Sequence, residues 1–246
     1  MSVETPPEVQ APPTPGGLRG KVIAAYGGAE RWRSSETVDA RFDCGGLLFN
    51  WKRGPDNWKS LHIHAEVHRP VVRIEPFDSK NSAAVLEGHD VRMEAPGGAP
   101  LDARWDARRH FNLPRKIGRW DQLDFAYFLS YAMWNYLTLP ALLLNEEIDW
   151  REVGPNTLEA RFPKHIPTHN KVQQYHFEDS GLLRQYDYDA EVFGPWAKAA
   201  HVVPEHASDD GLTYTSKRVI LPRMPNGKPL PGPKLIWADI HRFRLT

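Results

Sequence analysis

The sequence is poor in cysteine and has no excess charge of either sign. Its 246 residues include one cysteine, Cys44, which excludes an internal disulfide framework and any cysteine-rich zinc or iron–sulfur site. Lys plus Arg and Asp plus Glu both number 31, so the net charge gives no electrostatic attraction to nucleic acid or to an anionic membrane. The first ten residues, MSVETPPEVQ, lack the basic and apolar regions of a secretory signal. These absences together predict a cytoplasmic protein that binds no nucleic acid.

Several catalytic motifs are also missing. The chain has no G-x-S-x-G nucleophile elbow, no Walker A phosphate loop, no G-x-G-x-x-G after a strand and no H-E-x-x-H zinc motif. Cys44 stands beside a Gly-Gly pair and has no partner that the sequence identifies, which argues against a cysteine nucleophile. Standard hydrolase and nucleotide-driven mechanisms are therefore disfavoured, and no cofactor is predicted.

The chain divides into a proline-rich tail and one long ordered region. Residues 1–17 include TPPEVQAPPTPGG, and this composition predicts a disordered, flexible tail. From residue 18 the apolar spacing predicts a short N-terminal helix that ends at Gly27-Gly28. Short turns between the later segments predict antiparallel pairing. Alternation of apolar and polar residues predicts strands over 38–43, 47–51, 58–68, 71–76, 83–88, 90–94, 157–162, 171–177, 182–192, 212–221 and 234–245.

One segment, residues 122–144, is apolar on nearly every side. It is long enough to cross a bilayer as a helix, at roughly 35 Å. However, Asp124, Asn135 and Pro140 interrupt it and no stop-transfer pattern flanks it, so no transmembrane segment is predicted. A helix of this kind is buried, and Pro140 should end or kink it. The sequence therefore predicts a mainly β (α+β) fold with one domain over residues 18–246, in which a large curved antiparallel sheet, a half-barrel, wraps around a hydrophobic central helix.

Several stretches carry a resemblance to a known fold. A helix, a paired glycine, a short turn and a first long strand follow one another in KVIAAYGGAERWRSSETVDARF. A hairpin follows in YHFEDSGLLRQYDYDAEV, and two closing strands in GLTYTSKRVILPR and KLIWADIHRF. This layout resembles the lipoprotein-carrier fold of the LolA/LolB type, and the phrases RWDQLDFAYFLSYAMWNYLTLP, IPTHN and PNGKPLPGP resemble those of a group of uncharacterised bacterial proteins. The resemblance implies an apolar cavity between sheet and helices, which in the carriers holds acyl chains.

The stretch HIHAEVH, residues 62–68, places three imidazoles on one face of a strand. His62, His64 and His68 share that face, and apolar residues share the other. Two histidines at positions i and i+2 can both face one metal ion. A third ligand would have to come from a neighbouring strand or from Glu66, and nothing in the sequence fixes one. The opposite, apolar face is the core face. We therefore expect the histidines to face solvent, and a zinc or iron site here is the weaker alternative.

Aromatic residues supply the candidate ligand contacts. On the central helix Tyr127, Tyr131 and Trp134 are four and three residues apart, which places them in one stripe. Tyr188 lies in YDYDAEV, and its side chain points into the cavity if the aromatic face of that strand faces inward. Core packing is the simple alternative for each of the four. We predict binding of a hydrophobic small molecule in an internal, aromatic-lined cavity, and the sequence defines no oligomeric state.

A second hypothesis is a cofactor-independent enzyme, an isomerase, cyclase or lyase, that acts on an apolar substrate carrying an oxygen. His169 lies in KHIPTHN, a loop stiffened by two prolines, and histidine is the natural acid or base near neutral pH. Asp187 or His201 would orient His169, and a tyrosine would polarise the substrate oxygen. The alternative is a rigid connection whose histidines are solvated. An enzyme needs a titratable group that faces the cavity, whereas a carrier does not.

Overall fold

The computed structural model describes residues 17–55 and 57–246, which are built on one antiparallel sheet. The strands follow the order β6-β5-β4-β3-β2-β1-β13-β12-β11-β10-β9-β8-β7, and neighbouring strands are antiparallel. The strands of the first half are β1 (Thr37–Gly45), β2 (Asn57–Glu66), β3 (Val71–Glu75), β4 (Ala83–Glu87), β5 (Asp90–Glu94) and β6 (Pro100–Arg104). Those of the second half are β7 (Asp149–Gly154), β8 (Thr157–Arg161), β9 (Val172–Phe177), β10 (Leu183–Asp189), β11 (Lys198–Asp209), β12 (Leu212–Pro222) and β13 (Ile236–Leu245).

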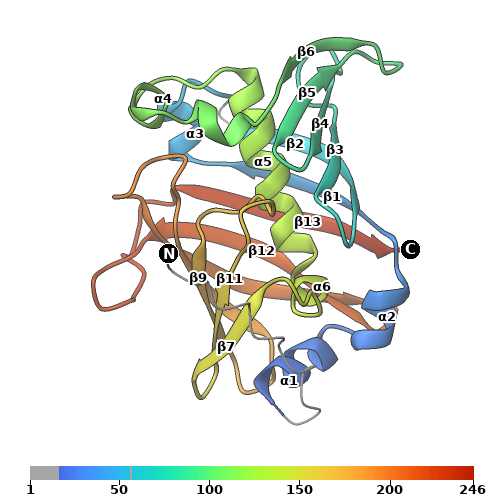
Figure 1. Ribbon diagram of the computed structural model, residues 1–246, viewed down its shortest axis with the longest axis vertical. Helices are drawn as coiled ribbons and strands as arrows, with labels where there is room; N and C mark the ends of the chain where they lie inside the picture. The colour runs from blue at the N-terminus through green and yellow to red at the C-terminus, as the bar shows by residue number, and fades with distance from the viewer. Residues whose placement is uncertain (1–16, 56) are drawn as a thin grey trace, which may run out of the picture.

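The structure has one long helix, and the other helices are short (Figure 1). The predicted N-terminal helix is confirmed as α1, whereas the predicted tail lies outside the described residues except for Gly17. The strands all belong to one sheet, and the division into a tail and a single domain stays a prediction. The helices are α1 (Leu18–Ala25), α2 (Ala29–Ser34), α3 (Leu47–Trp51), η1 (Ala107–His110), α4 (Leu113–Ile117), α5 (Gln122–Leu137) and α6 (Leu139–Leu142).

Helix α5 is the predicted central helix. It begins with a capping box in which Asp121 accepts from the backbone of Asp124 and Asp124 accepts from the backbone of Asp121. Its residues from Leu123 to Leu137 are all buried, and it contacts β3, β4, β5 and β6. The chain bends before Pro140 and continues as α6, because proline cannot donate a helical hydrogen bond. Figure 1 shows α5 lying against the sheet.

The fold class predicted from the sequence is confirmed. A large curved antiparallel sheet, open between its edge strands β6 and β7, carries the hydrophobic helix on its inner face. Among the described residues, no helix is both long enough and apolar enough to cross a bilayer.

The prediction of a strand over residues 47–51 is wrong, because this segment forms helix α3. Gly46 has a φ of 139°, a conformation that favours glycine, and it lies against the backbone of Leu235. The chain therefore turns away from the sheet instead of continuing the strand. Phe49 is buried in the core, while Leu47 and Trp51 are each 50% exposed. A strand would have placed all three side chains on one face.

Strand β11 was not predicted from the sequence. It contains Pro204, which lowers the strand propensity of its neighbours and cannot donate to a sheet ladder. The structure accommodates the proline with register shifts in the pairing to β12 between Val202 and His206.

Strand β2 has the predicted division of faces. Leu61, Ile63 and Ala65 are buried in the core, and His64 and His68 are exposed. The histidines of HIHAEVH therefore lie on the solvent-facing side of a half-buried segment.

Candidate functional site

A small apolar pocket lies where the loop after β10 meets the start of β11 and the end of β12. Its volume is about 210 Å³. Trp51 and Trp196 are 50% and 53% exposed and form its rim, whereas Phe128 and Phe193 are buried and form its wall. The pocket thus has an amphipathic aromatic rim and an apolar interior, as small-molecule sites commonly have.

The register of three strands aligns the residues on the sheet side of this pocket. Tyr188 of β10 pairs with Ala199 of β11, and Ala199 pairs with Pro222 at the end of β12. All three residues line the pocket. Side chains two residues apart on a strand share a face, so the next row lies deeper on the same inner face. That row consists of Tyr186, His201 and Ile220.

His169 and Tyr188 form the inner end of the pocket. Their rings stack with centroids 3.8 Å apart and an angle of 6° between the planes. His169 Nε2 lies 2.8 Å from the Tyr136 hydroxyl, and His169 Nδ1 lies 3.3 Å from the Tyr131 hydroxyl. The Tyr136 hydroxyl is also 3.3 Å from the Tyr188 hydroxyl. Each ring nitrogen of His169 therefore has a tyrosine partner, one accepting and one donating when the ring is neutral.

The loop that carries His169 is fixed by hydrogen bonds to its backbone. Arg108 donates to the carbonyl oxygens of Thr168 at 2.6 Å and His169 at 2.9 Å. Asn135 of α5 donates to the carbonyl oxygen of Pro167 at 2.8 Å. The loop thus directs His169 into the interior, where its side chain is fully buried. Burial and the nearby Arg108 guanidinium lower the pKa of His169 well below its usual value, so the ring is neutral at pH 7.

The tyrosine hydroxyls around His169 remain protonated. Burial raises the pKa of Tyr136 to about 12, and it raises the pKa values of Tyr131 and Tyr188 well above the usual value for tyrosine. The inner end of the pocket therefore offers neutral hydroxyl and imidazole groups. Such groups can orient an oxygen of a ligand but carry no negative charge at pH 7.

Arg218, a fully buried cation beneath this cluster, was not predicted from the sequence. The guanidinium lies 4.6 Å from the centroid of the Tyr136 ring and donates to the Tyr136 carbonyl at 2.9 Å. It also donates to His201 Nε2 at 3.2 Å. Lys217 and Arg218 are consecutive in a strand, so one of the two must face the core. That pair of adjacent cations was the signal that could have identified Arg218.

The three predicted ligand contacts on α5 lie away from the lining of the pocket. Tyr127 is fully buried, and its hydroxyl lies 2.7 Å from His89 Nδ1. Trp134 donates its indole N–H to the carbonyl of Glu66 at 2.8 Å. Tyr131 reaches the site indirectly, through His169. Of the four residues predicted to contact a ligand, Tyr188 lines the pocket, and the others fill the space between helix and sheet where the cavity was expected.

The predicted acid–base group is not assembled around His169. Asp187 points to the opposite face of β10, where it lies 3.2 Å from His176 Nε2 and 3.6 Å from Arg223. His201 belongs to the buried cluster, but its hydrogen bond is to Arg218. The structure therefore places neither residue in hydrogen-bond contact with His169, and the catalytic role of all three stays a prediction.

The histidines of β2 interact with a carboxylate on the neighbouring strand. His62 Nε2 and His64 Nδ1 lie 3.1 and 3.2 Å from Asp39, and His68 is exposed beyond them. The β2 histidines are not part of a group of three possible metal ligands within residues 17–55 and 57–246. In that part of the chain, the group of three whose ligand atoms lie close enough to share an ion is His110, Asp121 and Asp124.

The two carboxylates of that group already pair with arginines. Arg104 lies 2.8 Å from Asp121 and 2.7 Å from Asp124, and Arg115 lies 2.8 Å from Asp121. The same carboxylates cap the first turn of α5. Their arrangement is explained by the structure of the helix start, without an ion.

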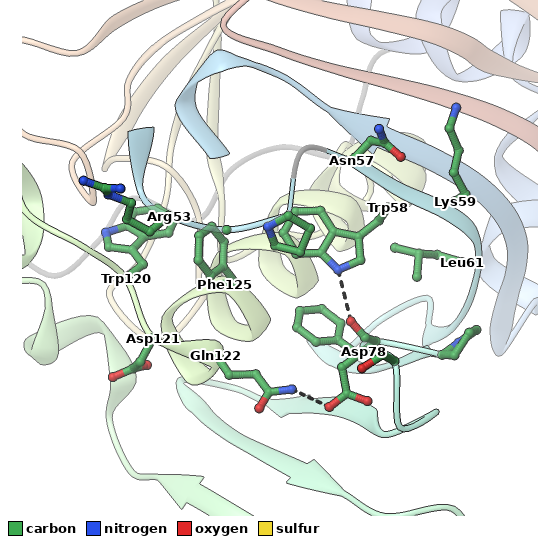
Figure 2. Close-up of a pocket in the computed structure, with 15 residues that line it drawn as sticks. Arg53, Asn57, Trp58, Lys59, Leu61, Asp78, Trp120, Asp121, Gln122 and Phe125 are labelled. Carbon is green, nitrogen blue, oxygen red and sulfur yellow. Dashed lines mark hydrogen bonds between the residues drawn. The ribbon is translucent and has the colours of Figure 1, made fainter. Parts of the chain in front are cut away.

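A second, wider pocket of about 590 Å³ opens beside the first turns of α5 (Figure 2). Trp58 donates its indole N–H to the carbonyl of Phe77 at 3.1 Å, and Gln122 donates to Asp78 at 2.7 Å. Figure 2 shows these groups arranged around an opening with both aromatic and charged side chains.

An aromatic wall separates the two pockets. The ring of Trp120 lies 5.3 Å from Phe125, which lines the wider pocket, and 4.6 Å from Phe193, which lines the smaller one. No histidine or tyrosine is among the described residues around the wider pocket. The smaller pocket combines an apolar interior with buried polar groups, and it is therefore the candidate site.

The fold aligns with the crystal structure of a LolA superfamily protein from Nitrosomonas europaea. The alignment covers 93% of this chain and 92% of that chain, with a TM-score of 0.50 and 9% sequence identity. The protein has a LolA-like fold. A DUF1329 family protein from Desulfovibrio piger also aligns, over 93% of this chain and 91% of that chain, with a TM-score of 0.49 and 11% identity. No family model matches the sequence of this LolA-like chain, and neither does any curated protein.

Proposed function

We propose that this LolA-like protein binds a hydrophobic small molecule in the pocket of about 210 Å³. The observation that carries the proposal is the composition of that pocket. Two half-exposed tryptophans, Trp51 and Trp196, flank its opening, and buried aromatic and aliphatic side chains line its interior. Exposed tryptophans at a rim are suited to contact both water and an apolar ligand. The predicted function is thus kept, but its proposed place moves from the helix–sheet interior to the start of β11 and the end of β12.

The volume of the pocket limits the size of the ligand. Pockets that bind drug-sized ligands have volumes of roughly 300–1,000 Å³. A pocket of about 210 Å³ corresponds to about seven water molecules at ~30 Å³ each. It therefore accepts one alkyl chain of moderate length or one ring, with any larger part of the molecule outside the tryptophan rim.

The test is a calorimetric titration of the protein with 1-octanol, a neutral molecule with a single alkyl chain. We expect saturable binding to the natural protein. Ala199 lines the sheet side of the pocket, so Ala199→Phe should fill the space and weaken binding by about tenfold or more. Ala103 is exposed on β6, so Ala103→Phe serves as the control and should leave the affinity unchanged. Equal binding by the natural protein and Ala199→Phe would place the ligand elsewhere. Absence of saturable binding both of 1-octanol and of octanoate, the carboxylate with the same chain length, would refute the proposal.

The cytoplasmic location predicted from the sequence is part of this proposal. Cell fractionation with an antibody against the protein tests it. Recovery with the cytoplasmic marker is expected, and recovery with a periplasmic marker would overturn it.

A further inference from the structure

In the part of the chain that the structure describes, the buried Arg218 side chain has no anionic partner. Within residues 17–55 and 57–246, no carboxylate forms an ion pair with its guanidinium. The surrounding groups are the hydroxyls and rings of tyrosines, and burial keeps Tyr136 and Tyr188 neutral by raising their pKa values. A guanidinium stays protonated at every physiological pH. The contact with the Tyr136 ring offsets only a small part of the cost of burying an unpaired charge.

Two hydrogen-bond donors of this cluster have no acceptor in the described part of the chain. One is Arg218 Nε. The other is Nδ1 of His201, which is fully buried. Because Arg218 donates to His201 Nε2, the proton of the neutral imidazole must be on Nδ1. Buried donors are almost always satisfied in native proteins, so two of them beside an unpaired cation indicate that an acceptor binds here.

The cluster lies directly behind the proposed ligand pocket. Ile220 lines the pocket, and Arg218 precedes it by two residues on the same inner face of β12. Neighbours of this kind are ~6.5–7 Å apart. Tyr136 connects the two regions, since its ring covers the guanidinium and its hydroxyl contacts Tyr188 and His169 at the inner end of the pocket.

We propose that the ligand is a hydrophobic carboxylic acid, bound as its carboxylate with the head group directed inward to Arg218 and His201. This inference rests on the proposed function and specifies the class of ligand. The planar guanidinium matches the two oxygens of a carboxylate, and the apolar chain of the ligand lies in the pocket behind the tryptophan rim. On binding, the hydroxyls of Tyr136 and Tyr188 separate, so that the carboxylate of the ligand reaches the Arg218 guanidinium. Both hydroxyls then donate further hydrogen bonds to that carboxylate.

The test compares octanoate with 1-octanol, which has the same alkyl chain without the charge, by calorimetric titration at pH 7.5. The natural protein should bind octanoate about tenfold or more tightly than 1-octanol, because hydrogen bonds between charged groups in a buried site are strong. Arg218→Met keeps a long side chain and removes the charge, so it should abolish the preference and still bind 1-octanol. Arg242→Met removes an exposed cation from the neighbouring strand β13 and should keep the preference.

The outcomes separate this inference from the proposed function. Binding of 1-octanol with no preference for octanoate in the natural protein would overturn the inference alone, and this comparison does not depend on the folding of any variant. A preference that survives in Arg218→Met would also overturn it. Failure of both molecules to bind would refute the proposed function and the inference together.

Discussion

Lowering the pH below 6.5 should destabilise the protein through His169 and His201. Both side chains are fully buried and neutral. Burial is the main cause of their lowered pKa values, and the positive charge of Arg108 acts on His169 and that of Arg218 on His201. In the unfolded chain both imidazoles bind a proton near pH 6.5. Below that pH the unfolded state therefore binds more protons than the folded state, and the free energy of unfolding falls as the pH falls.

The expected loss follows from this difference in proton binding. Each histidine that stays neutral in the folded state lowers the free energy of unfolding by up to about 1.4 kcal/mol for every pH unit below its pKa in the unfolded chain. Together, His169 and His201 reduce the free energy of unfolding by ~3 kcal/mol between pH 6.5 and pH 5. Domains of ordinary stability have only about 5–15 kcal/mol in total. The loss should therefore be clearly measurable.

Urea unfolding followed by tryptophan fluorescence, at several pH values between 7.5 and 5, measures this loss. The range stays above the pH at which most carboxylates titrate. His201→Gln removes one of the two buried titrations, and its loss of stability on acidification should be about half that of the natural protein. His68→Gln, at an exposed position just after β2, is the control and should lose as much as the natural protein. A stability that is constant down to pH 5, or an undiminished loss in His201→Gln, would refute the reasoning.

Two further predictions concern the segment around α3. Lys52 is buried and donates to the carbonyls of Arg115, Lys116 and Gly118 at the end of α4. Burial lowers its pKa to about 8, so the folded state loses this proton before the unfolded state does. The stability contributed by this residue should therefore rise from pH 7.5 to pH 9, and urea unfolding of Lys52→Met should lack this rise. Gly46→Ala would force a Cβ against the Leu235 carbonyl at a φ of 139°, so thermal unfolding should show that the free energy of unfolding falls by more than ~2 kcal/mol. Gly97 also has a positive φ but has open space around it, so Gly97→Ala should lose roughly 1 kcal/mol. Equal losses in the two variants would contradict this reasoning.

Most of the sheet and its central helix could be predicted because their signals are local. Alternation of polar and apolar residues marked β2 and β12, and the largely apolar run up to Pro140 marked α5. Helix α3 could not be predicted in the same way. Residues 47–51 satisfy a strand pattern, and only the contact of Gly46 with Leu235, distant in sequence, decides otherwise.

The candidate site depended on contacts that no local pattern contains. His169 and Tyr188 were each identified from sequence, but their stacking follows from the path of the loop over β10. The stripe of tyrosines on α5 was read as cavity lining because a buried helix face and a ligand-binding face have the same composition. Arg218 was not predicted because a charged residue in a strand is normally expected to face solvent. Here the Arg218 side chain faces inward, because it lies on the same face of β12 as the buried Ile220 two residues later.

The open sheet has two edges, and both have residues that discourage association with another sheet. Among the described strands, β6 has β5 as its one neighbour. It begins with Pro100 and carries Asp102 and Arg104. Strand β7, at the other edge, carries Asp149 and Arg151. Proline and charged side chains at an edge oppose the addition of a further strand, and so they oppose amyloid-like growth. The sheet can thus stay open without associating with other copies, because its two edge strands are poor templates for a further strand.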